Sequence, residues 1–523
     1  MSRGRIVAAS VAVALLAAAN VVAGQVDEPV RADGSTSLHV AAFEGDVGEA
    51  KRLIKAGANV RATNVYGVNA MQLAADSGNT ELIALLLKSG ADPMSPNADG
   101  ETALHLVARA GNVEAAKLLL KAGSKVDPRE TFGGQTPLMW AVARRHPAMV
   151  ALLASRGADV NARSAIRDYQ RVVQAESRAK SLDRGGLTPL LYAARENCRE
   201  CVEVLLQHKA DVNLGDPSEV SPLSVAMLNA NWDIARRLVE AGADVNAWDW
   251  YGRGPLNVAI GNMQTAGSRN PLDNDSPNKA TGRDLVNLLV ARGANPNQQQ
   301  HFGASGLGGA ADRGLTPFLV ACGTGNIDVV KLLLAHGANV KLATADGRGP
   351  IIMAVNARRG GRSPFAFPEE PAAPAAEGEG GGARGARTNP QVELVKLLAA
   401  AGADVSLMAK RHFLARTRGG SALHYVVRNG GNPQLIQALL DLKLDINVKD
   451  EDGLTALDYA MGRGYVPFLA MAQPPNVPVA TNLRKLGAKV ELAAIPDWPP
   501  QGPPIATAVY DAVLWPVESV VTR

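Results

Sequence analysis

A short pattern recurs along this chain at a fixed interval, and it constrains the fold more than any other feature. A Ser or Thr is followed by a small residue or proline, then by an apolar residue and often by His, as in Thr36 to His39 and Thr102 to His105. Successive copies that start at 36, 69 and 102, at 188, 221 and 254, and at 316 and 349 are each 33 residues apart. A fixed period of this length is typical of an array of stacked units, each of which contacts mainly its neighbours.

The stretch from Gly186 to Asp211 contains one complete unit. Thr188 is a candidate helix N-cap, because its hydroxyl group can accept a hydrogen bond from an unpaired amide, and Pro189 suits the first helical position. The apolar residues within 190–194 predict one short helix, and those within 201–206 predict a second helix after a turn. Each unit is therefore expected to be a helix–turn–helix, and its neighbours must stabilise it because neither short helix can bury its apolar face alone.

The unit is repeated about eleven times. Besides Thr188, copies that begin with Ser or Thr start at Thr36, Thr102, Thr136, Ser221, Thr316, Ser421 and Thr455. Weaker copies start at Asn69, Gly254 and Gly349. This pattern resembles the ankyrin repeat, across roughly residues 35–490. The resemblance implies an all-α fold, an ankyrin repeat solenoid of about eleven helix–turn–helix units with long insertions.

The resemblance also gives a role to the histidine of the pattern. In the ankyrin family this imidazole joins neighbouring repeats by hydrogen bonds, and it is present here only as His39, His105 and His424. The other copies have different residues at this place, namely Gln72, Met139, Leu191, Ser224, Asn257, Leu319, Ile352 and Asp458. We expect the interfaces that lack the histidine to depend more on apolar packing.

The N-terminus has the pattern of a signal peptide. Arg3 and Arg5 precede an apolar run over 6–22, and the small residues Ala23 and Gly24 follow it. An uncleaved membrane anchor is the alternative, since about 18 apolar residues can just span a bilayer. The many alanines and the small-residue site favour cleavage. Residues 1–24 are therefore predicted to be a signal peptide, and the mature chain is expected to be periplasmic or secreted, with no integral membrane domain.

Four long insertions interrupt the repeats, near 164–184, 261–280, 298–313 and 360–390. The first and third fall in loops that join two repeats, which project as fingers in the ankyrin family. The second and fourth fall between the two helices of one repeat. The insertion at 360–390 is rich in Pro, Ala and Gly, a composition that predicts disorder. The Pro-rich segment 491–523 is expected to be a C-terminal tail or cap.

The sequence gives little indication of catalysis. It has no H-E-x-x-H, no G-x-x-x-x-G-K-[ST] and no G-x-S-x-G motif. His146, His301 and His412 are scattered, and only a fold that brings them together would make them metal ligands. The net charge of +4 is small for this length, and no basic run with interleaved aromatic residues occurs. We therefore expect no enzyme activity, no cofactor, no metal and no nucleic-acid partner.

Cys198 and Cys201 have the spacing of redox pairs and of zinc half-sites. No second cysteine pair completes a zinc site, and three cysteines are too few for a fold that disulfides hold together. Cys201 also falls on the apolar stripe of a second helix. Buried structural thiols or a local structural disulfide are therefore favoured over a redox pair, which remains the alternative.

The positive indication of function lies at the tips of the fingers, where the ankyrin family places variable binding residues. Large aromatic residues occupy or adjoin these positions at Tyr66, Phe132, Trp248, Trp250 and Tyr251. Trp and Tyr combine apolar area with a polar group and are enriched at binding hot spots. These five residues are predicted to contact a protein partner. The alternative is that they fold back and cover neighbouring repeats.

Together these observations predict an exported, non-enzymatic ankyrin scaffold, a monomer that binds a protein on the concave face formed by the fingers and first helices. Two alternatives remain. One is an enzyme or redox protein that uses Cys198 and Cys201 or a site in an insertion, and the other is a structural element of the cell envelope.

Overall fold

The computed structural model describes residues 26–166, 185–250, 252–264, 278–301, 313–357, 389–410, 419–462, 465–466, 471–472 and 475–489. These residues form helices α2 to α23, together with one antiparallel pair of two-residue strands, β1 (Tyr465–Val466) and β2 (Met471–Ala472). The all-α prediction is therefore confirmed, and the small β1–β2 ladder is an addition to it. The predicted signal peptide (1–24) and C-terminal tail (491–523) lie outside the described residues.

The described residues form two compact units, which divide between residues 243 and 244. The first unit contains six helix pairs, α2 (Ser37–Glu44) with α3 (Val47–Lys55), α4 (Ala70–Asp76) with α5 (Thr80–Lys88), α6 (Ala103–Ala110) with α7 (Val113–Lys121), α8 (Pro137–Ala143) with α9 (Pro147–Ser155), α10 (Pro189–Arg195) with α11 (Arg199–Gln207), and α12 (Pro222–Leu228) with α13 (Trp232–Glu240). The second unit contains five pairs, α14 (Pro255–Asn262) with α15 (Gly282–Ala291), α16 (Pro317–Thr324) with α17 (Ile327–Ala335), α18 (Pro350–Val355) with α19 (Pro390–Ala400), α20 (Ala422–Arg428) with α21 (Pro433–Asp441), and α22 (Ala456–Ala460) with α23 (Val477–Lys485).

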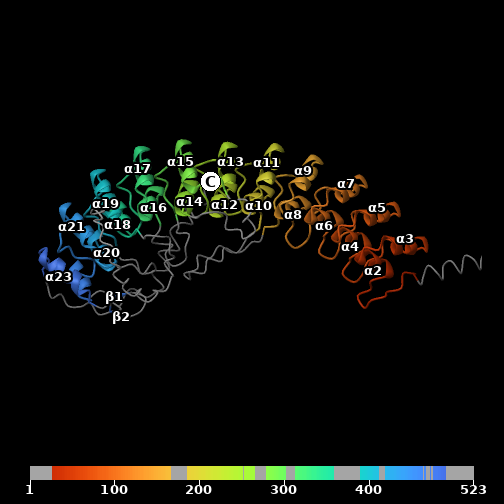
Figure 1. The fold of residues 1–523 in the computed structure, drawn as a ribbon, viewed down its shortest axis with the longest axis horizontal. Helices are drawn as coiled ribbons and strands as arrows, with labels where there is room; N and C mark the ends of the chain where they lie inside the picture. Colours follow the sequence, from red (N-terminus) through yellow and green to blue (C-terminus); the bar gives the residue numbers. More distant parts are fainter. Residues whose placement is uncertain are drawn as a thin grey trace, which may run out of the picture. The chain divides into compact units, whose positions relative to one another are not determined.

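Each unit has two layers of helices. In the first unit the first helices of the pairs pack on one another in chain order from α2 to α12, and the second helices do the same from α3 to α13. In the second unit the first helices pack in order from α14 to α22. Figure 1 shows the two layers of the first unit and, on the side of the first helices, the loops between repeats. We call each loop that leads into a first helix a finger.

The repeated Ser or Thr starts the first helices, as the sequence predicts. The Thr188 hydroxyl group accepts a hydrogen bond from the Leu191 amide, and Pro189 is the first residue of α10. The weaker copies at Gly254 and Gly349 also precede helices, but glycine offers no side chain as a cap. Glycine at this position costs a helix only a few tenths of a kcal/mol relative to Ser, Thr or Asn, so these two helix starts are only slightly weaker.

The histidine of the pattern connects repeats as the family resemblance implies. In His105, Nδ1 accepts a hydrogen bond from the Thr102 amide at 3.1 Å, so the proton is assigned to Nε2, which donates to the Gln135 carbonyl of the next finger at 3.1 Å. His39 and His424 make the same pair of bonds in their own repeats. Each imidazole therefore joins a helix cap to the following repeat.

Some of the substitutes for this histidine behave differently from our expectation. Gln72 Oε1 accepts a hydrogen bond from the Asn69 amide at 3.0 Å, and Gln72 Nε2 donates to the Glu101 carbonyl at 2.8 Å. The expected dependence on apolar packing is therefore wrong for this interface, because an amide can donate and accept in the same geometry. By contrast, Asn257 in the second unit is buried, and neither of its side-chain polar atoms has a partner among the described residues.

A second row of hydrogen bonds joins the turns between the helices of successive repeats. The Nδ2 atoms of Asn79 and Asn112 donate to the carbonyls of Gly45 (3.2 Å) and Gly78 (2.9 Å). His146 Nε2 contacts the Arg109 carbonyl at 3.0 Å in the same position of its repeat. His146 is therefore a regular member of this row, although the sequence shows it only as a histidine outside the repeated pattern.

The long insertions do not interrupt the stacking on either side of them. Asn161 Oδ1 accepts a hydrogen bond from the Asp211 amide (2.8 Å), although 167–184 lies between these residues. Asn246 Oδ1 and the Asn295 amide form the corresponding bond (2.8 Å) across 265–277. These segments, like 302–312 and 358–388, lie outside the described residues, so the predicted disorder of 360–390 falls mostly there.

One predicted boundary needs correction, because the insertion expected at 360–390 includes the start of a helix. The Asn389 side chain accepts a hydrogen bond from the Gln391 amide, and Pro390 is the first residue of α19. Pro suits this position because its missing amide has no intrahelical partner there. Asn389 and Pro390 therefore belong to the repeat.

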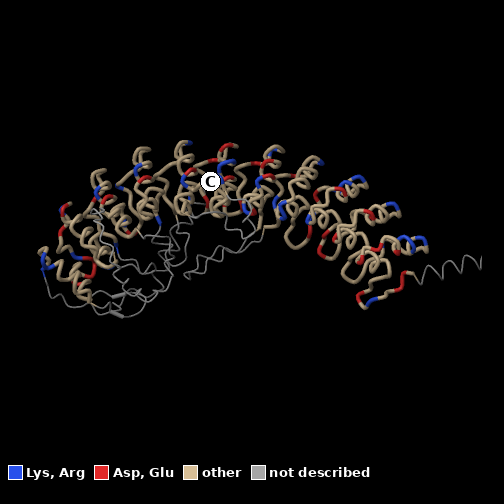
Figure 2. Tube along the Cα trace, in the orientation of Figure 1, with Lys and Arg blue, Asp and Glu red and all other residues tan. Residues whose placement is uncertain are grey.

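The first and last helix pairs present polar residues where internal pairs are apolar. Glu49 in α3 stands where α5 has the buried Leu82, 33 residues later, and it forms an ion pair with Arg52 at 2.6 Å. At the other end, Arg484 in α23 stands where α5 has Leu87 and α7 has Leu120, eight residues after the N-cap. Figure 2 shows charged residues of both signs along the outer helices of the first unit. A polar outer face is what terminal repeats of a solenoid need for solubility. In the described part of the chain no helix is long and apolar enough to cross a membrane.

The buried imidazoles predict an acid-sensitive stability. Burial lowers the pKa of His39, His105 and His424 below the usual value of about 6.5. The unfolded chain therefore binds more protons than the folded chain when the pH falls below about 6.5, and the free energy of unfolding decreases there.

The variant His105→Gln retains both hydrogen bonds, as Gln72 shows, but cannot be protonated. We expect it to reduce the slope of the free energy of unfolding against pH, by up to about 1.4 kcal/mol per pH unit between pH 6.5 and 5, in urea titrations at several pH values. His336→Gln is the matched control, since the His336 side chain is exposed. The same slope in His105→Gln and in the unmodified chain would contradict this account.

Candidate functional site

The finger tips of the first unit are joined to one another by main-chain hydrogen bonds. The Val65 amide donates to the Asp33 carbonyl (2.9 Å), and the Ala98 amide donates to the Tyr66 carbonyl (2.9 Å). The Thr131 amide donates to the Asp99 carbonyl at 2.8 Å in the next finger. A bond from Ala165 to Gly133 extends the series at 2.6 Å. These bonds hold successive tips side by side in one row.

The side chains at the ends of these fingers form the surface that we call the tip row. Its members are Asp33, Tyr66, Asp99, Phe132 and Ile166. The first four are each 33 residues apart, and Ile166 comes one residue later because the finger before it contains an additional glycine, Gly133–Gly134. Tyr66 is 62% exposed, Phe132 is 78% exposed and Ile166 is 55% exposed. The two predicted aromatic residues of this unit therefore lie at the surface and do not fold back onto the repeats.

Each finger also has internal hydrogen bonds that fix its tip. Asn64 Oδ1 accepts bonds from the amides of Tyr66 (3.1 Å) and Val68 (3.0 Å). In the finger that is longer by one residue, the buried Glu130 carboxylate accepts bonds from the amides of Phe132 (2.7 Å) and Gln135 (2.8 Å). The longer side chain of Glu matches the longer loop. The aromatic rings therefore extend from a backbone whose conformation is already set.

The predicted aromatic residues of the second unit are not equally accessible. Trp248 is 48% exposed, and its ring lies 5.1 Å from that of His301 between centroids. Trp250 is half-buried, and Tyr251 lies outside the described residues. Between the two tryptophans, Asp249 is buried and pairs with Arg253 at 2.6 Å. Tyr66 and Phe132 thus offer more accessible aromatic surface than this finger.

The first helices carry a set of arginine–aromatic contacts that the sequence analysis did not identify. The Arg109 guanidinium lies 5.4 Å from the centre of the Trp140 ring, and the Arg195 guanidinium lies 5.0 Å from that of Tyr192. In the second unit Arg428 lies over Tyr425 at 5.0 Å. The sequence does contain a pattern from which two of these contacts could have been predicted. Y-x-x-R occurs in two first helices, and this spacing places both residues on one helix face. The rings of Tyr192 and Tyr425 are buried and that of Trp140 is half-buried, so in these contacts the guanidinium groups are the more accessible partners.

Cys198 and Cys201 form a disulfide at the start of α11, and both residues are buried. Cys198 is the N-cap of α11, and Cys201 is the third helical residue. In α5 and α7 a side-chain hydrogen bond makes this same connection: the Leu82 amide donates to Asn79 Oδ1 and the Ala115 amide donates to Asn112 Oδ1, each at 3.0 Å. The disulfide thus occupies the place of a helix cap.

The other candidate groups for chemistry are dispersed. In the residues that the structure describes, no three His, Cys, Asp or Glu side chains gather closely enough to hold a metal ion. His301 lies against Trp248, and His412 is outside the described residues. Cys322 is buried in α16, and burial raises the pKa of its thiol group far above the usual value. A buried neutral thiol is a poor nucleophile.

Comparison with known proteins gives the family. A family model of ankyrin repeats, which covers three copies of the repeat, matches this chain at residues 7–97, 93–164, 169–249, 278–362 and 384–476. The chain belongs to the ankyrin repeat family. It is an ankyrin repeat scaffold built from the helix pairs and fingers described above.

Individual relatives share parts of the chain. The B-cell lymphoma 3 protein homolog of Mus musculus is 29% identical over 229 residues, which are 43% of this chain and 40% of that protein. The E3 ubiquitin-protein ligase KEG of Arabidopsis thaliana is 25% identical over 319 residues, which are 60% of this chain and 16% of that protein. The crystal structure of the ankyrin repeat domain of Bcl-3 has 26% identity and a TM-score of 0.38, and the match covers 49% of this chain and 99% of that domain. The chain thus spans less than half the length of these two sequence relatives.

The role of the disulfide can be tested by replacing it with a hydrogen-bonded cap. The double variant Cys198→Ala/Cys201→Ala should lower the free energy of unfolding by about 2 kcal/mol, the chain-entropy value for so short a loop. Cys198→Asn/Cys201→Ala should recover about 1 kcal/mol of this loss, since Asn caps helices well. Urea denaturation of both variants gives the comparison. If Asn restores nothing, the bond does not serve as a cap.

Proposed function

We propose that this chain is a non-enzymatic, monomeric scaffold that acts outside the cytoplasm and binds another protein through its fingers and first helices. The contact is centred on the tip row of the first unit. Export rests on the signal-peptide pattern of residues 1–24.

The exposure of Tyr66 and Phe132 carries this proposal. An exposed Tyr or Phe is a large apolar surface in contact with water, and such groups are frequent at the centres of interfaces. The ends of these fingers are fixed by the bonds from Ala98 to Tyr66 and from Thr131 to Asp99. A partner therefore loses little free energy in ordering the loops. Aromatic residues that served only to cover the repeats would be buried.

The first helices support the same face. Trp140 and Tyr192 lie on α8 and α10, each of which directly follows a finger, and each ring contacts an arginine. Aromatic and arginine side chains are both enriched at protein interfaces. Tyr192 itself is buried, so the groups that can extend the contact surface are the arginines, Arg109 (39% exposed) and Arg195 (41% exposed), and the half-buried Trp140 ring.

The two alternatives, a redox protein and a structural element of the cell envelope, lead to different expectations. A redox protein would need accessible sulfur atoms, and Cys198 and Cys201 are both buried. A structural envelope element would have no saturable soluble partner, whereas a scaffold of this kind has one.

The test begins with capture of a partner from the native envelope or secreted fraction by the mature chain, followed by a titration with the purified partner. The double variant Tyr66→Ala/Phe132→Ala should weaken binding at least tenfold, because anchors of this size contribute about 2 kcal/mol or more each. Its melting temperature should stay nearly unchanged, since both rings are exposed.

Trp250→Ala is the comparison variant for packing, since Trp250 is half-buried. We expect it to lower the melting temperature more than the tip variant does. Binding that is unaffected by Tyr66→Ala/Phe132→Ala, or that never saturates, would show that the proposed surface is wrong.

A further inference from the structure

We infer that the tip row of the first unit takes an extended protein segment in which a Lys or Arg lies between two apolar residues. This inference rests on the proposed function and names the chemistry of the partner. It comes from the order of side chains along the row, from their exposure and from the partners that each charged group already has.

Carboxylate and aromatic groups alternate along the tip row. Asp33, Tyr66, Asp99 and Phe132 occupy the same place in four successive fingers. The main-chain bonds described above join each of these fingers to the next. Asp99 thus has an exposed aromatic residue on each side, one finger away. A ligand whose cation pairs with Asp99 would therefore have an exposed aromatic ring available for an apolar contact on either side.

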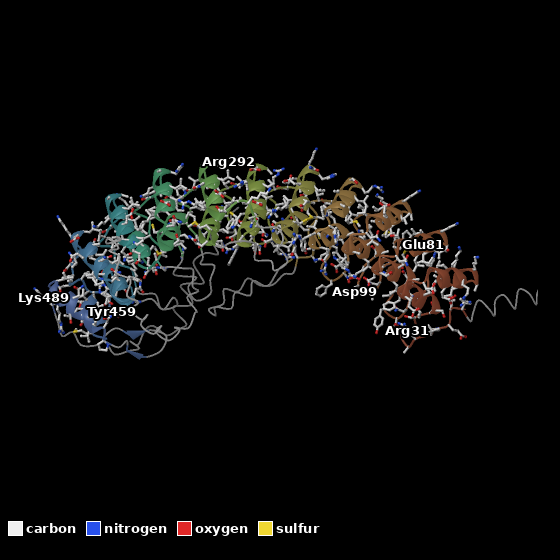
Figure 3. The ribbon with its side chains drawn as sticks, in the orientation of Figure 1. Arg31, Glu81, Asp99, Arg292, Tyr459 and Lys489 are labelled. Atoms are coloured by element: carbon white, nitrogen blue, oxygen red, sulfur yellow. A yellow bond between two sulfur atoms is a disulfide. The ribbon has the colours of Figure 1, made fainter. Side chains whose placement is uncertain are left out.

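The other acidic groups of these fingers already accept hydrogen bonds. Asp33 accepts one from the Ser35 amide (3.0 Å), and Glu101 accepts one from Asn97 Nδ2 (3.0 Å). Glu130 is occupied by the amides of its own loop. By contrast, no described residue donates a hydrogen bond to the exposed carboxylate of Asp99, which Figure 3 shows at the finger side of the first unit. This group can accept bonds from an incoming cation without first giving up an internal partner.

The arginines of the same fingers already have partners, and the exposed Lys125 lies close to the end of α7, not at a tip. Arg31 lies over the Phe43 ring at 6.0 Å, and Arg129 Nη1 donates to the carbonyl groups of Gly134 (2.8 Å) and Arg163 (2.5 Å). These contacts hold the Arg31 guanidinium against α2 and the Arg129 guanidinium between its own finger and the next. The charge left for a partner at the centre of the row is therefore negative, and a basic side chain complements it.

The spacing of the row favours an extended segment. Packed helices lie about 10 Å apart, so consecutive fingers of stacked repeats are separated by a similar distance. A polyproline-type or strand-like segment covers about 10 Å in three residues. In a polyproline helix, residues three apart also lie on the same face. The segment that fits would have an apolar residue three positions before and three positions after its Lys or Arg.

The probe is a display library of random twelve-residue peptides, selected on the full chain and counter-selected on the Tyr66→Ala/Phe132→Ala variant. We expect the enriched peptides to contain a Lys or Arg with apolar residues three positions away on both sides. One such peptide is then titrated by fluorescence anisotropy. Asp99→Lys should weaken its binding at least tenfold, and it should improve the binding of the same peptide with Glu in place of the basic residue.

Glu81→Lys is the matched control for charge reversal, because Glu81 is exposed on α5 and lies in the outer helix layer (Figure 3). It should change the affinity less than twofold. Enrichment of acidic or uncharged peptides, no enrichment at all, or equal effects of Asp99→Lys and Glu81→Lys would overturn the inference.

Binding of the native partner by the same two variants tests this inference separately from the proposed function. If Tyr66→Ala/Phe132→Ala abolishes binding of that partner while Asp99→Lys leaves it unchanged, the tip row is the binding surface but its ligand is not basic. If neither variant affects that binding, both proposals fail.

Discussion

No helix pair of this chain can bury its apolar residues without a neighbour, and every ordered feature depends on that constraint. Leu82 and Leu86 are fully buried although they belong to a short helix, α5, because α4 of the same pair and the second helices on either side, α3 and α7, pack against it. Stacking also brings each first-helix cap within reach of the following finger, where His105 or Gln72 bonds to a carbonyl. The fingers are therefore ordered because the helices pack on one another.

This dependence explains how loops can form a binding surface. A free loop would lose conformational entropy on binding. The tips of the first unit are already ordered, because the Asn64 and Glu130 side chains accept hydrogen bonds from amides of their own fingers and because neighbouring tips are joined by main-chain hydrogen bonds. The residues beyond those bonds can then vary without any effect on the fold. Tyr66, Asp99 and Phe132 lie at such places, and in the proposed binding mode their chemistry determines which partner fits. The insertions leave the hydrogen bonds between repeats in place, as Asn161 and Asp211 show.

The sequence predicts the parts of this structure that depend on local chemistry. Helix starts such as Thr188 and Asn69 could be predicted because capping needs only a residue type at a given spacing. The bridging role of Gln72 and the place of His146 could not, since each depends on a carbonyl of another repeat. The solvent exposure of the aromatic side chains could not be predicted either. Phe132 and Trp250 occupy similar positions in their fingers, and their surroundings in the fold leave Phe132 exposed and Trp250 half-buried. The tip row could therefore be recognised as a candidate site only from the structure.

The most direct test of this account is the hydrogen exchange of the tip amides in the free protein. The amides of Ala98 and Thr131 donate to neighbouring fingers, so they should exchange as slowly as amides in the middle of α6, to which their repeats are coupled. That result would show that the tip row is ordered before a partner binds. Exchange at the rate of an unstructured loop would contradict the central claim, because the fingers would then be independent and Tyr66, Asp99 and Phe132 would form no common surface.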